Sequence, residues 1–527
     1  MNHLPVHWLR DNPGALGPQW LVSDSLLAAA ELSPADAAII IGGRSRDFEE
    51  LADASLRLGR ALQDLGLERG GRVVIQTMNI WECAVAIYAS SLAGGVFVVV
   101  GPQTKAPRLS YVLRDSGAQF LVTQSSLLGN FGAIAEELPS LRHVIVVGED
   151  NELPAPAVPF RELLERTDPA PVTRSIPVDL AALIYTSGST GNPKGVMMRH
   201  ASMVFTTQSL CSYLRLSASD RILNFLPLAF DYGLYQLLMA VHLRATLILE
   251  QSFTFPRQII DRVTELEATV FPGVPTVFAT MRALMREKPD LHLPSVRRVT
   301  NTAAALPPPI LGDLRRLFPN ALIFAMYGLT ECKRVSYLEP ELLEDRPSSV
   351  GKAIPGTETL VLVDGRPAAP GETGILHVRG PHVMAGYWQQ PALTDEMLVD
   401  GPTPGERMLC TQDSFTIDED GFLYFVGRTD EIIKTGGQKV SPVEVEHALH
   451  SLPEVRDAAV VGVPHELLGE AIRAFVVLQP GAELTELDAI RRSKSLLEPI
   501  MVPHEIVFVA ELPTTESGKI RKQGLTP

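Results

Sequence analysis

Short apolar runs alternate with longer amphipathic segments through the first third of the chain. Runs rich in Val, Ile and Phe predict buried strands over residues 72–78, 94–101, 118–124 and 142–148. The segment 48–66, FEELADASLRLGRALQDLG, has apolar residues at helical spacing and predicts an amphipathic helix. Because strands that alternate with helices form parallel sheets, this part of the chain is predicted to be an α/β unit.

The same alternation returns in the middle of the chain. Strands are predicted over residues 245–250, 268–275, 297–303 and 321–328, and helices over 255–267 and 307–318. A second α/β layer is therefore expected. Neither half contains an internal repeat or a low-complexity tract.

The pattern changes from about residue 350, where short strands are broken by Gly, Pro and Asp turns. The runs 357–365, 374–380 and 421–428 predict a β-rich subdomain. Beyond them, a helix over 443–452 and strands over 456–463, 472–479 and 505–512 predict a compact α+β unit. The predicted fold class is α/β: a large N-terminal domain, residues 1–429, with two α/β subdomains and a β-rich subdomain, and a small mobile α+β C-terminal domain, residues 430–527.

The composition narrows the class of protein. A chain of 527 residues with 46% hydrophobic residues can build more than one core. A formal net charge of -15 and the lack of a long basic run argue against a nucleic-acid partner. The sequence shows no signal-peptide pattern and no uninterrupted apolar stretch of membrane-spanning length, so no membrane partner is expected. The cysteines are scattered without metal-ligand spacing, which favours a cytoplasmic location without structural zinc: Cys83, Cys211, Cys332 and Cys410.

The loop YTSGSTGNPKG, residues 185–195, combines glycines, hydroxyls and one lysine. Glycines without a Cβ let backbone N–H groups approach phosphate oxygens, and the hydroxyls and Lys194 add donors and charge. A strand is predicted over 179–185 and a helix over 196–210, which would place the loop at a strand end, where α/β folds bind ligands. A Gly/Ser surface linker is the alternative. A kinase-type phosphate loop fits worse, because Lys194 stands between Pro193 and Gly195.

Six further motifs follow this loop in order. They are FDYG from residue 230, NTAAAL from 301, MYGLTEC from 326, CTQDSF from 410, GRTDEIIKTGGQKV from 427 and PTTESGKIRK from 513. Through these motifs, nearly the whole chain resembles the adenylate-forming superfamily of acyl-CoA synthetases, aryl-CoA ligases and peptide-synthetase adenylation domains. The resemblance implies an AMP-forming acid–thiol ligase, which converts a carboxylate and Mg·ATP into an acyl adenylate and pyrophosphate and then passes the acyl group to a thiol.

This chemistry explains the residue types in the motifs. When a carboxylate attacks the α-phosphorus of ATP, negative charge grows on the phosphoryl oxygens and the departing pyrophosphate, and preorganised cations offset it. The resemblance implies that Lys519 orients the carboxylate and the α-phosphate during adenylation, and that Glu331 and Thr186 hold Mg²⁺. Lys439 is a further catalytic candidate, in contact with either phosphate or the thiol cofactor.

The resemblance also implies a nucleotide site. Tyr327 is expected to lie against adenine, Asp413 to accept the ribose hydroxyls, and Arg428 to contact the ribose and phosphate. Outside the motif, Asp413 would be read as an ordinary turn aspartate, and Gln412 replaces the glycine that usually precedes it. The full expected set is Thr186, Ser187, Gly188, Ser189, Thr190, Gly191, Lys194, Asn301, Thr302, Ala303, Tyr327, Gly328, Thr330, Glu331, Asp413, Arg428 and Lys519.

The acid site is expected around Phe230 and Asp231. In the resembling amino-acid-activating domains this aspartate pairs with the substrate amino group, and a carboxylate beside the pocket favours an ammonium over a plain fatty acid. The alternative is that Asp231 caps the helix that follows it. The expected acid-binding residues, several of them small enough to leave volume, are Phe230, Asp231, Gly273, Val274, Ala303, Ala304 and Cys332.

Two cations directly follow Cys332. Lys333 and Arg334 are expected to be surface charge or fold support, and the alternative is contact with a second substrate carboxylate or with the phosphates of a thiol carrier.

The acceptor is expected to arrive from outside the chain. By resemblance, Asp430 marks the hinge about which the small domain rotates, and Gly436 and Gly437 leave room for a pantetheine arm. The acceptor is either coenzyme A or the phosphopantetheine of a separate carrier protein, and the Phe-Asp pair favours the carrier. More distant alternatives are a non-thiol nucleophile, a non-catalytic nucleotide-binding protein and a light-producing oxygenase on the same scaffold.

Overall fold

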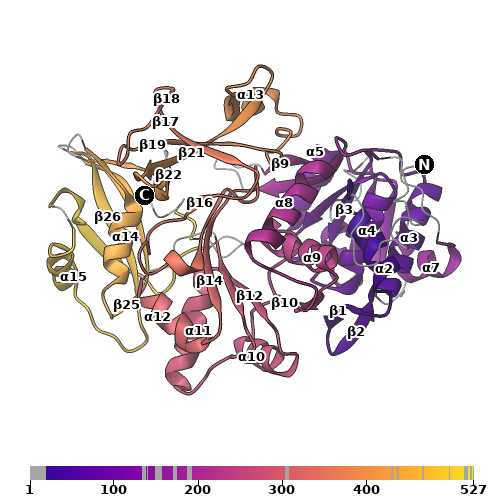
Figure 1. Ribbon diagram of the computed structural model, residues 1–527, viewed down its shortest axis with the longest axis horizontal. Coiled ribbons are helices and arrows are strands. Elements are labelled where there is room, and N and C mark those ends of the chain that lie inside the picture. The colour runs from indigo at the N-terminus through magenta and orange to yellow at the C-terminus, as the bar shows by residue number, and fades with distance from the viewer. Residues whose placement is uncertain are drawn as a thin grey trace.

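The computed structural model describes residues 19–132, 134, 138, 140–148, 157–169, 175–186, 193–302, 308–428, 431–435, 438–465, 468–497, 499–514, 520–522 and 525. Figure 1 shows a large body made of sheets covered by helices, with the C-terminal unit at one end beside α11 and α12. The predicted α/β class and the division into a large and a small unit are confirmed.

The first sheet has seven strands in the order β7-β6-β5-β3-β4-β8-β9. Its strands are β3 (Arg72–Gln76), β4 (Val96–Val100), β5 (Phe120–Gln124), β6 (His143–Val147), β7 (Ala157–Pro159), β8 (Leu180–Thr186) and β9 (Lys194–Arg199). The helices in this stretch are α3 (Phe48–Asp64), α4 (Trp81–Leu92), α5 (Ala106–Ser116), α6 (Leu128–Gly132) and α7 (Phe160–Arg166), with a 3₁₀ turn η1 (Ser125–Leu127). All its pairs are parallel except β8–β9, which is antiparallel.

The second sheet has nine strands in the order β16-β15-β14-β13-β12-β10-β11-β1-β2. They are β1 (Ala37–Ile41), β2 (Arg44–Asp47), β10 (Arg221–Asn224), β11 (Thr246–Leu249), β12 (Val270–Gly273), β13 (Arg298–Asn301), β14 (Leu322–Tyr327), β15 (Ser336–Leu338) and β16 (Lys352–Ala353). The helices in this stretch are α8 (His200–Tyr213), α9 (Asp231–Leu243), α10 (Pro256–Glu265), α11 (Pro275–Glu287) and α12 (Pro308–Leu317), with a 3₁₀ turn η3 (Pro340–Leu342). The N-terminal helix α2 spans Asp24–Leu32.

The β-rich subdomain is a six-stranded antiparallel sheet. Its elements are β17 (Glu358–Val363), β18 (Arg366–Pro367), β19 (Gly374–Arg379), β20 (Leu398–Asp400), β21 (Arg407–Ile417), β22 (Leu423–Arg428) and the helix α13 (Pro391–Met397). The C-terminal unit has a five-stranded sheet and its own core. It contains β23 (Ile433–Thr435), β24 (Gln438–Val440), α14 (Pro442–His450), β25 (Val455–His465), β26 (Gly469–Leu478), α15 (Glu486–Ser493), η4 (Pro499–Met501) and β27 (Glu505–Phe508).

One prediction about the N-terminal half was wrong, and one feature of it was not predicted. Residues 194–199 form strand β9, which pairs with β8, so the phosphate loop connects a hairpin and the helix begins only at His200. The apolar residues of 196–198 are held there by backbone bonds on both sides, since Met197 N also donates to Gly386 O at 2.9 Å. In addition, β1 crosses to the second sheet and pairs with β11, so the two α/β layers are not separate in sequence.

The helix predicted over 48–66 shows how local sequence and packing agree. α3 begins after a capping box in which Asp47 accepts from Glu50 N and Glu50 accepts from Asp47 N. Its residues Phe48, Leu51 and Leu58 are fully buried, and the helix packs against α2, α4, α7 and the strands β1 and β2 of the second sheet. This packing joins the two N-terminal sheets through one continuous apolar core.

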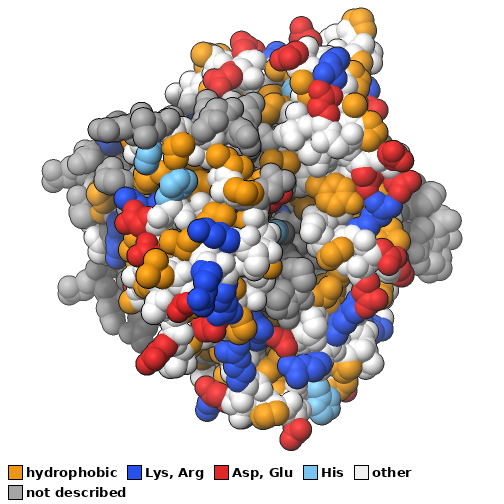
Figure 2. Space-filling model, turned by 90° about the vertical axis from the view of Figure 1, so that its left-hand side faces the viewer, with side chains coloured by type: hydrophobic (Ala, Val, Ile, Leu, Met, Phe, Trp, Pro, Cys, Tyr) orange, Lys and Arg blue, Asp and Glu red, His pale blue; other side chains and the backbone are white. Residues whose placement is uncertain are grey.

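Figure 2 views the molecule from the side of the C-terminal unit. Basic and acidic side chains lie beside one another on this face. Within the described residues, no helix has the length and apolar character needed to cross a membrane.

Candidate active site

The carboxyl ends of parallel strands β12, β13 and β14 meet at one edge of the second sheet. Gly273 pairs with Asn301, and Asn301 pairs with Ala325, so the residues that follow these strands emerge side by side. Asn301 and Thr302 are buried at this edge. The carboxyl edge of a parallel sheet is where α/β folds place ligands.

The turn after β14 is unusually tight. A Cβ on Gly328 would lie 2.2 Å from the carbonyl oxygen of Lys333, so only glycine fits where the chain folds back. Lys333 itself has φ 66, in the left-handed region. This turn presents Glu331 on one side and carries Lys333 and Arg334 back into the interior.

Glu331 is held by two contacts. The Tyr387 hydroxyl donates to Glu331 Oε1 at 2.7 Å, and Met384 N donates to the Glu331 carbonyl at 2.8 Å. Burial and then the Glu331 carboxylate raise the pKa of Tyr387 well above its ordinary value, so Tyr387 stays a donor. A fixed carboxylate oxygen at the sheet edge fits Mg²⁺, which prefers oxygen ligands.

The loop from 185 to 195 has a rigid base. Tyr185 donates through its hydroxyl to Asp115 Oδ2 at 2.5 Å, and the Trp388 indole donates to the Asp115 carbonyl at 2.9 Å. Thr186 and Lys194 are paired across the hairpin, and the Lys194 ammonium lies 5.7 Å from the centre of the Tyr387 ring. Thr186, Lys194 and Glu331 are thus linked through the segment that carries Tyr387.

Asp413 lies on β21 beside Tyr327. The Tyr327 hydroxyl donates to Asp413 Oδ2, and Arg428 Nε lies 3.9 Å from Asp413 Oδ1. The Tyr327 ring packs against Phe415 with ring centres 4.9 Å apart. Gln412, which replaces the usual glycine, adopts φ 58 within β21, in the left-handed region that favours glycine. The geometry brings three predicted nucleotide residues together.

Asp231 has a different environment from the one predicted. It is the first residue of α9, whose N-cap is Phe230, and the helix has no side-chain cap. The interpretation of Asp231 as a helix cap is therefore wrong. Its Oδ2 lies 3.8 Å from Arg334 Nη1, so a cation of the chain itself already stands beside Asp231. Gly233 is required because a Cβ there would lie 2.3 Å from the Pro227 carbonyl oxygen.

Lys333 and Arg334 were expected to be surface charge or fold support, and the surface-charge part of that prediction was wrong. The tight turn buries Lys333 completely and leaves Arg334 only 4% exposed. Burial lowers the pKa of Lys333 to about 8. Cys332 beside them is fully buried, and burial raises the pKa of its thiol, which makes it unreactive packing.

The volume expected at Gly273 is not free. A Cβ on Gly273 would lie 2.3 Å from the Phe278 ring, which fills that space, and Val274 is buried as the N-cap of α11. The Tyr232 hydroxyl accepts from Gly273 N at 3.3 Å and donates to the Thr300 carbonyl at 2.8 Å. These contacts fix the backbone where the acid site was predicted.

Several predicted residues lie outside the described part of the chain. They are Ser187, Gly188, Ser189, Thr190, Gly191, Ala303, Ala304, Asp430, Gly436, Gly437 and Lys519. Lys439 is on β24, opposite Lys434 on β23. Near Lys519, Thr514 and Ile520 form an antiparallel bridge, and Lys522 Nζ lies 2.7 Å from Glu446 on α14, which anchors this end of the chain.

Tyr387, Trp388 and Asp115 were not predicted from the sequence. Their contacts join α5, the β8–β9 hairpin and the β-rich subdomain, and no local periodicity signals such contacts. The adjacent aromatics of GYW at 386–388 were the available cue.

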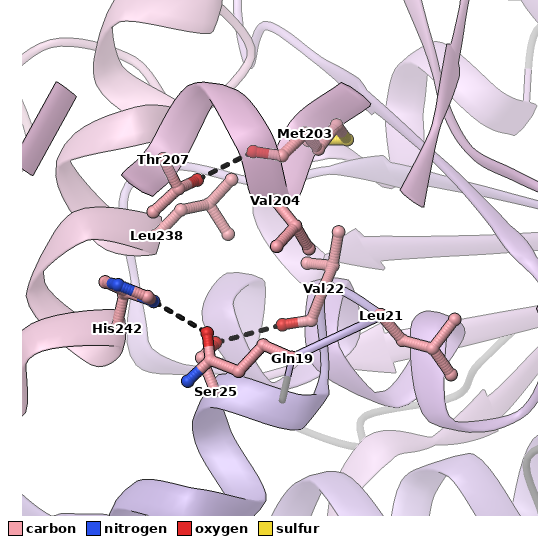
Figure 3. Close-up of a pocket in the computed structure, with 9 residues that line it drawn as sticks. All are labelled: Gln19, Leu21, Val22, Ser25, Met203, Val204, Thr207, Leu238 and His242. Atoms are coloured by element: carbon pink, nitrogen blue, oxygen red, sulfur yellow. Dashed lines mark hydrogen bonds between the residues drawn. The ribbon is translucent and has the colours of Figure 1, made fainter. Parts of the chain in front are cut away.

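A small pocket elsewhere is distinct from this site. Figure 3 shows it lined by Gln19, Leu21, Val22, Ser25, Met203, Val204, Thr207, Leu238 and His242. His242 is eleven residues beyond Asp231 on α9, about 16 Å along the helix. The His242 ring is already hydrogen-bonded to Gln19 at 2.7 Å, and the pocket is a packing gap between α2, α8 and α9.

Comparison with known proteins identifies the family. A model of AMP-binding enzymes matches residues 26–388, and a model of the AMP-binding enzyme C-terminal domain matches residues 444–519. The chain belongs to the AMP-binding enzyme family. It is an AMP-forming ligase, as the resemblance implied.

Relatives of this AMP-binding enzyme span its whole length. A long-chain-fatty-acid–CoA ligase of Bacillus subtilis is 29% identical over 98% of this chain and 97% of the relative. A feruloyl-CoA synthase of Amycolatopsis is 31% identical over 94% of this chain and 96% of the relative.

Solved structures agree with the family assignment. An anthranilate CoA ligase, AuaEII, in complex with anthranoyl-AMP superposes with a TM-score of 0.89 at 27% identity, covering 96% of each chain. The o-succinylbenzoate coenzyme A synthetase of Bacillus subtilis in complex with ATP and magnesium ion has a TM-score of 0.81 at 26% identity, covering 94% of this chain and 98% of that one.

Proposed function

We propose that this AMP-binding enzyme is an acyl- or aryl-CoA synthetase that activates a small-molecule carboxylic acid and transfers it to coenzyme A. The observation that carries the proposal is the linked set of Glu331, Tyr387 and Lys194 at the same site as Asp413 and Tyr327. This set supplies a metal-binding oxygen, a phosphate-binding cation and a ribose acceptor. Similarity to CoA ligases supports coenzyme A as the thiol.

The described residues have distinct roles in this proposal. Glu331, oriented by Tyr387, and Thr186 would hold Mg²⁺, which would neutralise negative charge on the phosphates. Lys194 places a cation at the base of the phosphate loop. Asp413 accepts the ribose hydroxyls, and Arg428 lies near enough to contact the ribose and phosphate.

The C-terminal unit supplies the remaining roles. Lys519 neutralises charge between the acid and the α-phosphate during adenylation, without acting as a base. The domain boundary at residues 429–430, the hinge at Asp430 and the thiol-side loop with Gly436, Gly437 and Lys439 belong to this proposal. A separate core in the C-terminal unit supports its movement as one body.

The preference for an amino-bearing acid and a carrier protein, drawn from the Phe-Asp pair, is not part of this proposal. It rested on an unpaired carboxylate, but Arg334 already lies 3.8 Å from Asp231. A cytoplasmic location stays a prediction, in keeping with four cysteines that form no disulfide.

Acceptor competition tests the proposal. The wild-type enzyme, ATP, Mg²⁺ and an acid that supports pyrophosphate exchange are incubated with coenzyme A or with a phosphopantetheine-loaded carrier protein. We expect mass spectrometry to show acyl-CoA at a rate that exceeds carrier loading. Loading of the carrier alone would contradict the choice of coenzyme A, and exchange without either thioester would point to a non-thiol nucleophile.

A further inference from the structure

Two neighbouring cations are buried at the acid side of the site. Lys333 is fully buried and Arg334 is 4% exposed, whereas the side chain of Asp231 is 20% exposed. Side chains with a full charge are rarely buried without partners, because desolvation of the charge is costly. Because the pair lies beside the proposed acid site, we consider whether it contacts the acid.

The hydrogen bonds of the pair leave donor capacity unused. Lys333 Nζ donates to the Thr330 carbonyl at 2.6 Å, and Arg334 Nη1 donates to the Lys333 carbonyl at 2.8 Å. Arg334 Nε is buried and has no hydrogen-bond partner in the described structure. The separation of 3.8 Å between Arg334 Nη1 and Asp231 Oδ2 is too long for a direct hydrogen bond.

The local charges do not balance. Asp231 and Glu331 are the carboxylates whose fields act on Lys333, and Glu331 is committed to Tyr387 and to the proposed metal. Asp231 is then left to offset two cations. His382, which contacts the Arg334 backbone, stays neutral because burial lowers its pKa to about 4. The aromatic face of Tyr232, 4.9 Å from the guanidinium, gives Arg334 partial support without a negative charge.

We propose that Lys333 and Arg334 select acids whose acyl part carries a second anionic oxygen group, so that dicarboxylic acids are preferred over matched neutral or ammonium-bearing acids. The second group accepts from the unused Arg334 donor and completes the charge balance that Asp231 leaves open. An ammonium group would add a third cation beside one carboxylate and is disfavoured. This inference rests on the proposed ligase function and names its substrate class.

Length-matched acids test this preference in the wild-type enzyme. Three sets are compared by ATP–pyrophosphate exchange: butanoate, succinate and 4-aminobutanoate; octanoate, octanedioate and 8-aminooctanoate; and benzoate, isophthalate and 3-(aminomethyl)benzoate. In the set that fits the pocket best, we expect kcat/KM for the dicarboxylate to exceed that of the neutral acid by about 10-fold to 100-fold, the range for one charge-assisted hydrogen bond. We expect the ammonium acid to be the poorest of the three.

Variants assign the preference to Arg334. Arg334→Gln is expected to reduce the dicarboxylate-to-neutral ratio to near one with little change for the neutral acid, whereas Arg334→Lys keeps part of the ratio. Asp231→Asn is expected to increase the ratio, because it removes the competing carboxylate. Arg346→Gln is the matched control, since Arg346 is also paired with carboxylates but lies on the β-rich side, near Asp418.

The outcomes distinguish a failure of the substrate preference from a failure of the proposed ligase function. Preference for the neutral or ammonium acid in the wild type, or an unchanged ratio in Arg334→Gln, would overturn the inference while the ligase function stands. If Arg334→Gln does not fold, the wild-type ratios together with Arg334→Lys and Asp231→Asn decide. Absence of exchange with every acid would instead contradict the proposed function.

Discussion

Removal of a single hydroxyl tests the arrangement of the metal-binding residue. Tyr387→Phe keeps the ring and its contact with Lys194 but deletes the bond to Glu331, which is 2.7 Å long. A hydrogen bond to a charged group contributes about 1.5–3 kcal/mol. The Glu331 backbone remains fixed through Met384, so the loss falls on the orientation of the carboxylate.

The lower end of that range sets the expected effect. About 1.5 kcal/mol corresponds to roughly tenfold in an equilibrium constant. We therefore expect Tyr387→Phe to raise the Mg²⁺ concentration for half-maximal pyrophosphate exchange about tenfold, with a smaller change in the rate at saturating Mg²⁺. The assay is exchange measured over a Mg²⁺ titration at fixed ATP and acid.

A matched control separates this effect from the loss of any tyrosine hydroxyl. Tyr337 also donates to a glutamate, Glu339, at 2.7 Å, but Glu339 is not among the residues proposed to hold the metal. Tyr337→Phe is expected to leave the Mg²⁺ curve unchanged. A Tyr387→Phe curve that superposes on the wild-type curve would refute the role of Tyr387 in orienting Glu331.

Three other changes probe catalysis, backbone strain and buried charge. Lys519→Ala should slow adenylation by about 10²-fold or more while sparing transfer from a supplied acyl adenylate to coenzyme A, as a lost transition-state cation would; unchanged pyrophosphate release would exclude the assigned role. Gln412→Val should lower the midpoint of thermal unfolding, because a β-branched residue at φ 58 costs about 1–3 kcal/mol, whereas Gln412→Gly should not lower it. Equal midpoints for the two variants would show that the backbone at residue 412 is not strained. Burial lowers the pKa of Lys333 to about 8 from 10.5. Between these two pH values the unfolded chain binds a proton that the folded enzyme has released. The free energy of unfolding of the wild type, relative to that of Lys333→Met, should therefore rise as the pH rises. Thermal unfolding from pH 7 to 11 measures that difference, and a flat or falling difference would contradict the burial of the charge.

Much of the fold follows from local patterns. The apolar runs of β3 to β6 and β11 to β14 and the amphipathic helix α3 are each encoded in contiguous residues, and the structure places them as expected. Strand β9 was mistaken for the start of a helix because one of its partners, the segment at Gly386, is distant in sequence, and the other, β8, is reached only through the hairpin. Local pattern does not report such pairing.

The candidate site was predictable in its residue types but not in its contacts. The motifs indicated Glu331, Asp413 and Tyr327, and the structure brings the last two into direct contact. The burial of Lys333 and Arg334 depends on a tight turn that is possible because Gly328 has no Cβ to clash with the Lys333 carbonyl. The composition of the motif does not reveal this turn. Charged residues next to a motif are predicted from sequence to be exposed, but the geometry of the turn determines whether their side chains are buried.

One measurement tests the central claim most directly. The purified enzyme is incubated with Mg·ATP, coenzyme A and the best acid from the matched sets, and nucleotide and thioester products are quantified together. The account predicts AMP and acyl-CoA in equal amounts, with pyrophosphate and no ADP. Formation of ADP and phosphate, or no acid-dependent AMP, would contradict it.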